Sequence, residues 1–203
     1  MKRTERNYIY SLIEDLKIDT AKLSILIKIY ENKEFEIDTV LSMYSKLYES
    51  YNDTLWRNLP SVTQFPDFTY TDRTMQQLKN SGGMQKITNT NALNGIIEYD
   101  LSVKHLMESY IPDLGFYYQH SNQMWFEIFD IADYESDKKK ISIKEMEKGN
   151  KNYLLKSDNE TLGKFNNIIR YFKYDVTLVK ETELELKTKA EQLILLLKKE
   201  YEI

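Results

Sequence analysis

The chain contains no cysteine, and only three prolines and six glycines occur among its 203 residues. The lack of cysteine excludes disulfide bonds, thiolate metal sites and a cysteine nucleophile. A fold built on many tight turns needs more glycine and proline, so the composition favours long helices. The sequence also lacks any run of 18 apolar residues, which excludes a membrane span within it.

The charge balance is mildly acidic, with 28 lysines and arginines against 32 aspartates and glutamates. Nucleic-acid binding needs a net basic surface or stripe, so we expect no nucleic-acid partner. Local basic runs occur, such as residues 138–140, but this run is flanked by Asp133, Glu135, Asp137 and Glu145 and is typical of a solvated loop.

Residue groups that carry chemistry are also scarce. His105 and Glu108 stand three residues apart on an expected helix and could offer two metal ligands. A di-iron bundle, however, needs Glu-x-x-His motifs on two helices, and the chain has none. The pair Gly82-Gly83 lacks the following Lys-Ser or Lys-Thr of a phosphate-binding loop. We therefore expect no catalytic, cofactor-binding or metal-binding residues, no cofactor and no enzyme activity.

Apolar residues recur at helical spacing in the first quarter of the chain. They predict a helix from about Thr4 to Glu31 that ends at residues 32–34, and a second helix with Asp38 as its N-cap. Residues 53–69 are predicted to form a loop, because two prolines and few periodic positions occur there.

A short helix is expected next, capped by Thr71 or Asp72 and extending to Lys79. Residues 81–83, Ser-Gly-Gly, predict its end, because glycine adopts the left-handed conformation of a helix stop at little cost.

The next helix is expected to begin at Asn89 or Thr90. Pro112 should kink or break it, because proline cannot donate the helical hydrogen bond. Helix should resume through an aromatic stretch and end near Ile131. Residues 132–156 are charged and predict mainly a loop, in which residues 141–143 could be extended and residues 144–148 could form a helical turn.

The longest helix is predicted from about Asp158 to Tyr201, after a Ser-Asp-Asn-Glu capping box at residues 157–160. Its apolar positions form two heptad rows, and Glu183 interrupts the second of them. The rows are Phe165, Phe172, Val179, Leu186 and Leu193, and then Ile169, Val176, Ala190 and Leu197.

These patterns together predict an all-α fold, a single helical-bundle domain over residues 1–203. We expect an elongated bundle of about four or five main helices, with loop insertions at about 53–69 and 132–156. The long helices at the two ends of the chain should pack side by side, because both carry near-heptad stripes.

Aromatic residues are the least ordinary feature, with 16 tyrosines and two tryptophans. Large amphipathic side chains can fill the edge of a helical core, and that is the simpler interpretation. The alternative is an aromatic-lined pocket or a partner-binding patch. Its candidate residues are Tyr117, Tyr118, His120, Trp125 and Phe126.

Tyr70, residues 78–82 (Leu-Lys-Asn-Ser-Gly), Ile87, Asn91, Leu93 and Tyr99 form a pattern of a helix stop and a following helix. This pattern resembles that of a bacterial family known only as a domain of unknown function. Members carry a Thr-Tyr-x-x-Leu-Lys-x-Ser-Gly helix stop, followed by a helix that ends in a tyrosine-rich stretch, although Tyr70 stands farther from the stop here than in the family pattern. Residues 6–16 are similar to the family's first extracytoplasmic helix, and the last helix of the chain also resembles its counterpart.

The resemblance implies a membrane-anchored helical protein, in which a short cytoplasmic tail and one transmembrane helix precede the domain. This chain resembles the part that faces the periplasm from the inner membrane, so we expect Met1 to be an introduced start. The expected partners are the membrane, through the missing upstream helix, and a second copy or another protein. The family implies no activity and no functional residues.

Three functions remain open at this point. The leading one is a non-enzymatic extracytoplasmic sensing or scaffolding domain of a single-pass membrane protein. The second is a soluble cytoplasmic interaction module that forms a coiled coil through residues 165–197. The third is a small-ligand binder or an enzyme that uses the aromatic region 116–129.

Overall fold

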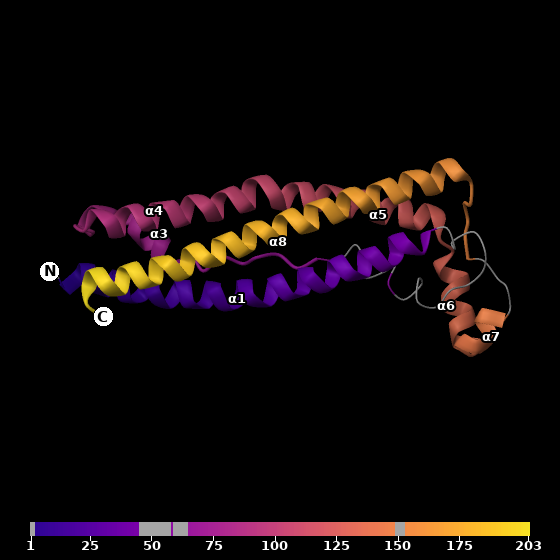
Figure 1. Cartoon of the computed structure of the whole chain (residues 1–203), viewed down its shortest axis with the longest axis horizontal. Coiled ribbons are helices and arrows are strands. Elements are labelled where there is room, and N and C mark those ends of the chain that lie inside the picture. Colours follow the sequence, from indigo (N-terminus) through magenta and orange to yellow (C-terminus); the bar gives the residue numbers. More distant parts are fainter. Residues whose placement is uncertain (1–2, 45–57, 59–64, 149–152) are drawn as a thin grey trace. The chain divides into compact units, whose positions relative to one another are not determined.

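A computed structural model describes residues 3–44, 58, 65–148 and 153–203, and Figure 1 shows the arrangement of its helices. The described residues contain no strand beyond one isolated bridge, which joins Phe129 and Leu154. The predicted all-α helical bundle is therefore confirmed. Its helices are α1 (Arg3–Ser42), α3 (Arg73–Asn80), α4 (Thr90–His105), α5 (Ile111–Ile128), α6 (Ile131–Lys140), α7 (Ile143–Lys148) and α8 (Asn159–Tyr201), with a 3-10 turn, η2 (Met84–Lys86), and a π-helical turn, η3 (Leu106–Tyr110).

The contacts of the chain group into two compact units. Unit 1 consists of Met1–Ile29, Pro66–Ile111 and Leu178–Ile203, and unit 2 of Tyr30–Phe65 and Pro112–Thr177. Both long helices, α1 and α8, contribute residues to both units. The sequence shows no boundary between the units, because no change in helical periodicity marks it.

Unit 1 forms where the first part of α1, the last part of α8 and α4 lie side by side (Figure 1). Fully buried side chains from all three helices fill it, among them Ile9, Leu23, Ile96 and Leu197. Each such side chain stabilises the fold by about 1.5–3 kcal/mol through its removal from water. The close approach of α4 to α8 uses Gly95, where a Cβ would stand 2.9 Å from Leu193 Cδ1.

The predicted helix end at residues 32–34 is wrong, because α1 continues through them to Ser42. Asn, Lys and Glu carry no geometry that stops a helix, and the buried stripe also continues, through Tyr30, Lys33 and Ile37. Lys33 remains buried because its ammonium group pairs with Glu36 at 3.1 Å.

In unit 2, α1 contacts α8 through Glu34, which accepts a hydrogen bond of 2.6 Å from Thr177. The predicted contact between the terminal helices is therefore confirmed.

The glycine stop after α3 has the predicted geometry. Gly82 has φ +64°, and a Cβ at Gly83 would stand 2.9 Å from Leu78 Cα. The interruption predicted at Pro112 is also found. Helix α4 ends at His105, the wide turn η3 follows, and α5 begins at Ile111, so Pro112 stands in the first turn of α5.

In unit 2, the prediction that residues 132–156 form mainly a loop is wrong, because α6 and α7 occupy most of the segment, although α7 agrees with the helical turn predicted at residues 144–148. Asp130 caps α6, and its carboxylate accepts a bond of 2.9 Å from the Asp133 backbone N–H. Buried Tyr153 then anchors the chain, because its backbone carbonyl accepts from the Asp130 N–H at 2.9 Å. Helix α5 ends at Ile128, slightly before the predicted Ile131, and most of the predicted loop 53–69 lies outside the described residues.

The start of α8 is close to the prediction, with Asp158 as its cap. The Asp158 carboxylate accepts a hydrogen bond of 2.8 Å from the Thr161 backbone N–H. The heptad rows of α8 are buried throughout, and Glu183, which interrupts them, is buried as well.

Candidate functional site

The five predicted patch residues all lie on α5, but they do not form one surface. Tyr118 is half-buried, and its ring meets Phe65 edge-on at 5.4 Å. Trp125 packs on buried Phe129 at 4.3 Å between ring centroids. Phe126 remains 71% exposed, and no ring contact of it is found in the described part of the chain.

Tyr117 and His120 belong to a different face of α5. The ring of Tyr117 stacks on Tyr171 of α8, with 5.6 Å between centroids and 5° between planes. Phe116 meets Tyr117 edge-on at 5.2 Å and lies 4.1 Å from the His120 ring. The structure therefore brings two of the predicted residues together with two aromatic residues that the patch did not include.

A further exposed ring extends this surface along α8. Tyr174 follows Tyr171 by three residues, which is close to one helical turn. The two rings are 65% and 59% exposed, and with Arg170 they line a shallow depression of about 260 Å³. We call Phe116, Tyr117, Tyr171 and Tyr174 the aromatic face of unit 2.

A buried carboxylate lies at the edge of the aromatic face. Asp175 follows Tyr171 by four residues, is only 8% exposed, and its Oδ2 atom has no hydrogen-bond partner in the described structure. Burial, and then the negative charge of Asp113 on α5, raise the pKa of the Asp175 carboxyl to about 6. The pKa of Tyr117 is also raised, by burial and then by the charge of Asp175. Two carboxylates from two helices therefore act on one tyrosine.

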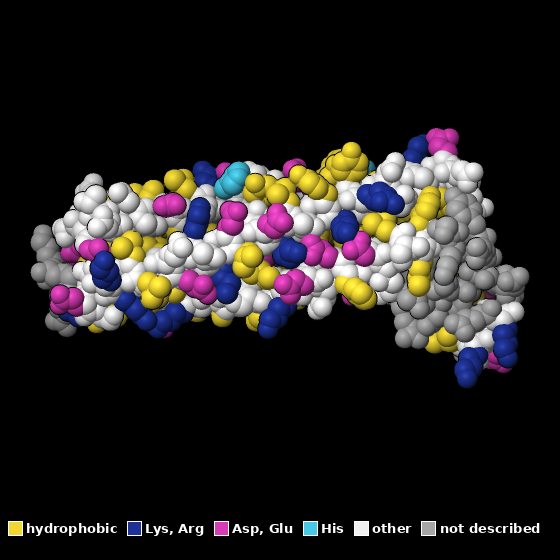
Figure 2. All heavy atoms as spheres, in the orientation of Figure 1, with side chains coloured by type: hydrophobic (Ala, Val, Ile, Leu, Met, Phe, Trp, Pro, Cys, Tyr) yellow, Lys and Arg dark blue, Asp and Glu magenta, His cyan; other side chains and the backbone are white. Residues whose placement is uncertain are grey.

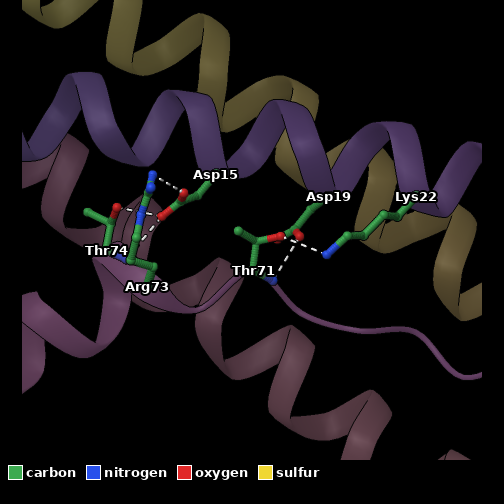
Figure 3. Close-up of polar contacts among 6 residues, drawn as sticks. All are labelled: Asp15, Asp19, Lys22, Thr71, Arg73 and Thr74. Atoms are coloured by element: carbon green, nitrogen blue, oxygen red, sulfur yellow. Dashed lines mark hydrogen bonds and ion pairs between the residues drawn. The ribbon is translucent and has the colours of Figure 1, made fainter.

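Three buried carboxylates of unit 1, those of Glu5, Asp15 and Asp19, provide a contrast, because each of them has hydrogen-bond partners. Asp15 of α1 accepts from the Arg73 guanidinium at 2.7 Å and from the Thr74 backbone N–H at 3.0 Å (Figure 3). Asp19, one turn later, accepts from the Thr71 backbone N–H at 2.9 Å and from the Tyr99 hydroxyl at 3.1 Å.

This cluster holds the segment before α3 against α1. Lys22 completes it by donating to the Thr69 carbonyl at 2.7 Å and to the Thr71 hydroxyl at 3.0 Å. Asp15 lies on α1 but accepts the Thr74 backbone N–H, which has no acceptor within the first turn of α3. The expected cap of α3, Asp72, makes no side-chain capping bond. The cluster is a structural connection, because its oxygens are used in holding the chain.

Glu5 has a similar role at the ends of the chain. Its carboxylate accepts from the Thr88 backbone N–H and from the Tyr201 hydroxyl, each at 2.8 Å. Burial acts to raise the pKa of Glu5, but these hydrogen bonds outweigh it and lower the pKa. The first turn of α1 and the last turn of α8 are joined in this way.

Glu183 is the second buried carboxylate without a partner. It is fully buried in unit 1, and neither carboxylate oxygen has a hydrogen bond within the described residues. Burial raises its pKa to about 8. Glu183 has no exposed surface from which a ligand could be bound, so it affects stability and not recognition.

Both histidines contact neighbours on their own helical segments. His105 bonds to Ser109 at 3.2 Å through Nδ1, and Glu108 pairs with Lys104 at 3.7 Å instead of with the imidazole. His120 Nδ1 lies 3.0 Å from the Phe116 carbonyl oxygen. Among the described residues, no group of three histidine or acidic side chains could hold a metal ion.

Two surface properties bear on partners. On the face shown in Figure 2, acidic and basic side chains alternate along the surface and do not separate into patches of one sign. The heptad rows within residues 165–197 are buried in the chain itself, so they offer no free stripe for a coiled coil. Within the described residues, no helix has the length and apolar character needed to cross a membrane.

The sequence could have indicated part of the site that the prediction missed. Tyr171, Tyr174 and Asp175 stand at helical spacing on a predicted helix, so the sequence predicts that they share a face. The sequence does not predict the stacking partner of Tyr171, because Tyr117 is 54 residues away and the two rings meet only by tertiary packing.

Comparison of the chain with protein-family models, with curated proteins and with solved structures found no match in any of the three. The family resemblance therefore stays a prediction.

Proposed function

We propose that this chain is a non-enzymatic sensing domain that faces the extracytoplasmic side of a single-pass membrane protein. The observation that carries the proposal is the Glu5 junction, which joins the first turn of α1 to the last turn of α8. A helix that continues upstream from α1 would thus also be held by Thr88, in the segment before α4, and by Tyr201 of α8. The family resemblance supports the membrane anchor, and the aromatic face supports a ligand.

The mechanism follows from the continuity of α8. This helix carries Tyr171 and Asp175 in unit 2 and ends at Tyr201, whose hydroxyl donates to Glu5. A small axial shift or rotation of α8 on ligand binding would reach the Glu5 junction, and from there the start of α1. Helix shifts of about 1–2 Å are a common form of such transmission.

The lack of cysteine makes the location testable with unique labels. We would express the gene from its native start with cysteine in place of exposed Glu202, and treat intact cells with a membrane-impermeant thiol reagent. The expected result is labelling in intact cells and recovery of the protein with the membrane fraction. Recovery in the soluble cytoplasmic fraction without labelling would refute the proposed location.

The transmission step has its own test. Spin labels at Tyr8 and Glu202 report the geometry of the Glu5 junction, and ligand binding should change the distance between them. Glu5→Gln should weaken the junction, because an amide accepts the two hydrogen bonds less strongly than a carboxylate does. An unchanged distance distribution at saturating ligand would contradict the mechanism.

A soluble coiled-coil module is the weaker candidate, because the heptad rows that it needs are buried. An enzyme is not supported by a particular group of residues, since the candidate carboxylates Asp113 and Asp175 have no nucleophile or base beside them in the described structure other than tyrosine.

A further inference from the structure

We propose that the aromatic face of unit 2, together with Asp113 and Asp175, is a binding site for an alkylated ammonium group. The inference deepens the proposed sensing function by naming what is sensed. Binding itself can be measured without any assumption about the membrane or about transmission.

The unmet charge of Asp175 is the first argument. A carboxylate taken out of water is costly unless it is paired or hydrogen-bonded. Asp15 and Asp19 in unit 1 satisfy this rule through Arg73, Thr74 and Thr71. Asp175 is 8% exposed, and its buried Oδ2 has no donor in the described part of the chain.

The second argument is that the nearest charge makes this cost larger. Asp113 lies on α5 one turn before Tyr117, and it acts on Asp175 with the same sign of charge. None of the ion pairs found among the described residues includes either carboxylate. The neighbouring lysine of α8, Lys173, is paired with Asp38 of α1 at 2.6 Å. A cation bound from outside the chain would offset both the cost of burying the Asp175 charge and its repulsion by Asp113.

The rings determine which kind of cation fits. Tyr171 and Tyr174 are more than half exposed, and Tyr117 lies against Tyr171 within the same surface. A cation within about 6 Å of a tyrosine ring centroid is attracted to the ring face, and methylated ammonium groups are bound in this way between several rings. A small metal ion would bind the carboxylates but would leave the exposed rings without a role.

Arg170 is the competing cation of the chain itself, since it lines the same depression as Tyr171 and Tyr174. It stands five residues before Asp175 and makes no ion pair with it in the structure. Arg170→Gln should therefore leave ligand binding unchanged or make it tighter.

The experiment compares two ligands of the same shape by titration calorimetry. Choline carries the quaternary ammonium, and 3,3-dimethylbutan-1-ol is its neutral carbon analogue. We expect choline to bind with a dissociation constant in the millimolar range or below, and the alcohol to bind at least about tenfold more weakly. Nε-trimethyl-lysine amide distinguishes two sources of the ammonium group, a free small molecule and a methylated lysine of another protein. Tighter binding of this amide than of choline indicates the methylated lysine.

Two variants test the residues. Asp175→Asn removes the charge and Tyr171→Leu removes the ring, and each should weaken choline binding by about tenfold. Phe126→Leu is the matched control, because this ring is 71% exposed on α5 and lies outside the aromatic face. Asp175→Asn should also stabilise the fold, so a loss of binding in this variant is not explained by unfolding.

Equal binding of choline and its neutral analogue would overturn the proposal, as would wild-type affinity in Asp175→Asn or Tyr171→Leu. The absence of any choline binding at about 10 mM would overturn it too. Binding without a change at the Glu5 junction would instead leave the ligand site in place and count against the transmission step alone.

Discussion

Replacement of Glu183 by methionine should stabilise the protein at neutral pH. The side chains have similar length, and methionine places no polar atom that needs a partner in the core of unit 1. Glu183 is fully buried, and its pKa is raised by burial from 4.5 to about 8. The folded state therefore holds this carboxyl protonated at pH 7, whereas the unfolded chain releases the proton.

The size of the effect follows from proton linkage. Below the unfolded pKa, a carboxyl group whose folded pKa is raised has no effect on stability, because the folded and unfolded states both hold the proton. As pH rises from there toward the folded pKa, only the unfolded state releases the proton, and the free energy of unfolding falls. For the two pKa values of Glu183, the loss is about 3 kcal/mol at pH 7 and close to zero at pH 4. Glu183→Met removes this loss, so its stabilisation should be about 3 kcal/mol larger at pH 7 than at pH 4.

The assay is urea unfolding followed by far-ultraviolet circular dichroism at pH 4 and pH 7. Comparing the change between variants at the two pH values cancels the other titrating groups, which both proteins share. Glu181→Met is the matched control, since this carboxylate is exposed on the same helix and carries no burial cost. A stabilisation of equal size at both pH values, or a destabilisation at pH 7, would refute the argument from burial.

Three further predictions concern stability. Asp175→Asn should raise the unfolding free energy by about 1–2 kcal/mol at pH 7.5 but not at pH 3.5, because the pKa of Asp175 is raised to about 6. Equal melting curves of the variant and the unchanged protein at pH 7.5 would contradict this. Asp15→Ala should destabilise by about 2–4 kcal/mol, because it leaves the Thr74 donors buried without an acceptor; a loss below about 1 kcal/mol in urea unfolding would show that water replaces the carboxylate. Gly82→Ala should cost about 1 kcal/mol, because its φ of +64° strains an L-residue, and Gly115→Ala, at an ordinary φ within α5, is the control for the melting measurement.

The helices that the sequence predicts well are those with long apolar periodicity. The buried rows of α8 agree with the heptad positions read from the sequence, and the stop at Gly82 has the expected left-handed conformation. Both features depend on local rules, either side-chain spacing along one helix or the conformational range of one residue.

The failures occur where a polar segment is helical for reasons outside itself. Residues 32–34 remain helical in α1 because Tyr30 and Ile37 on either side are buried in unit 2. Helices α6 and α7 have weak patterns, and the chain after them is held by the backbone bonds of Tyr153 and Leu155 to the end of α5. Tertiary contacts of this kind override local propensity.

For the candidate site, the sequence by itself determined the residue types, the helices that carry them and their spacing. It placed Tyr117 and His120 on one predicted helix, and Tyr171 and Asp175 one turn apart on another. Only the tertiary structure decided which rings meet and which carboxylates lose their water, because packing between α5 and α8 sets both. The unpartnered state of Asp175 has no sequence signature, since burial and hydrogen bonding of a side chain depend on neighbours far away along the chain.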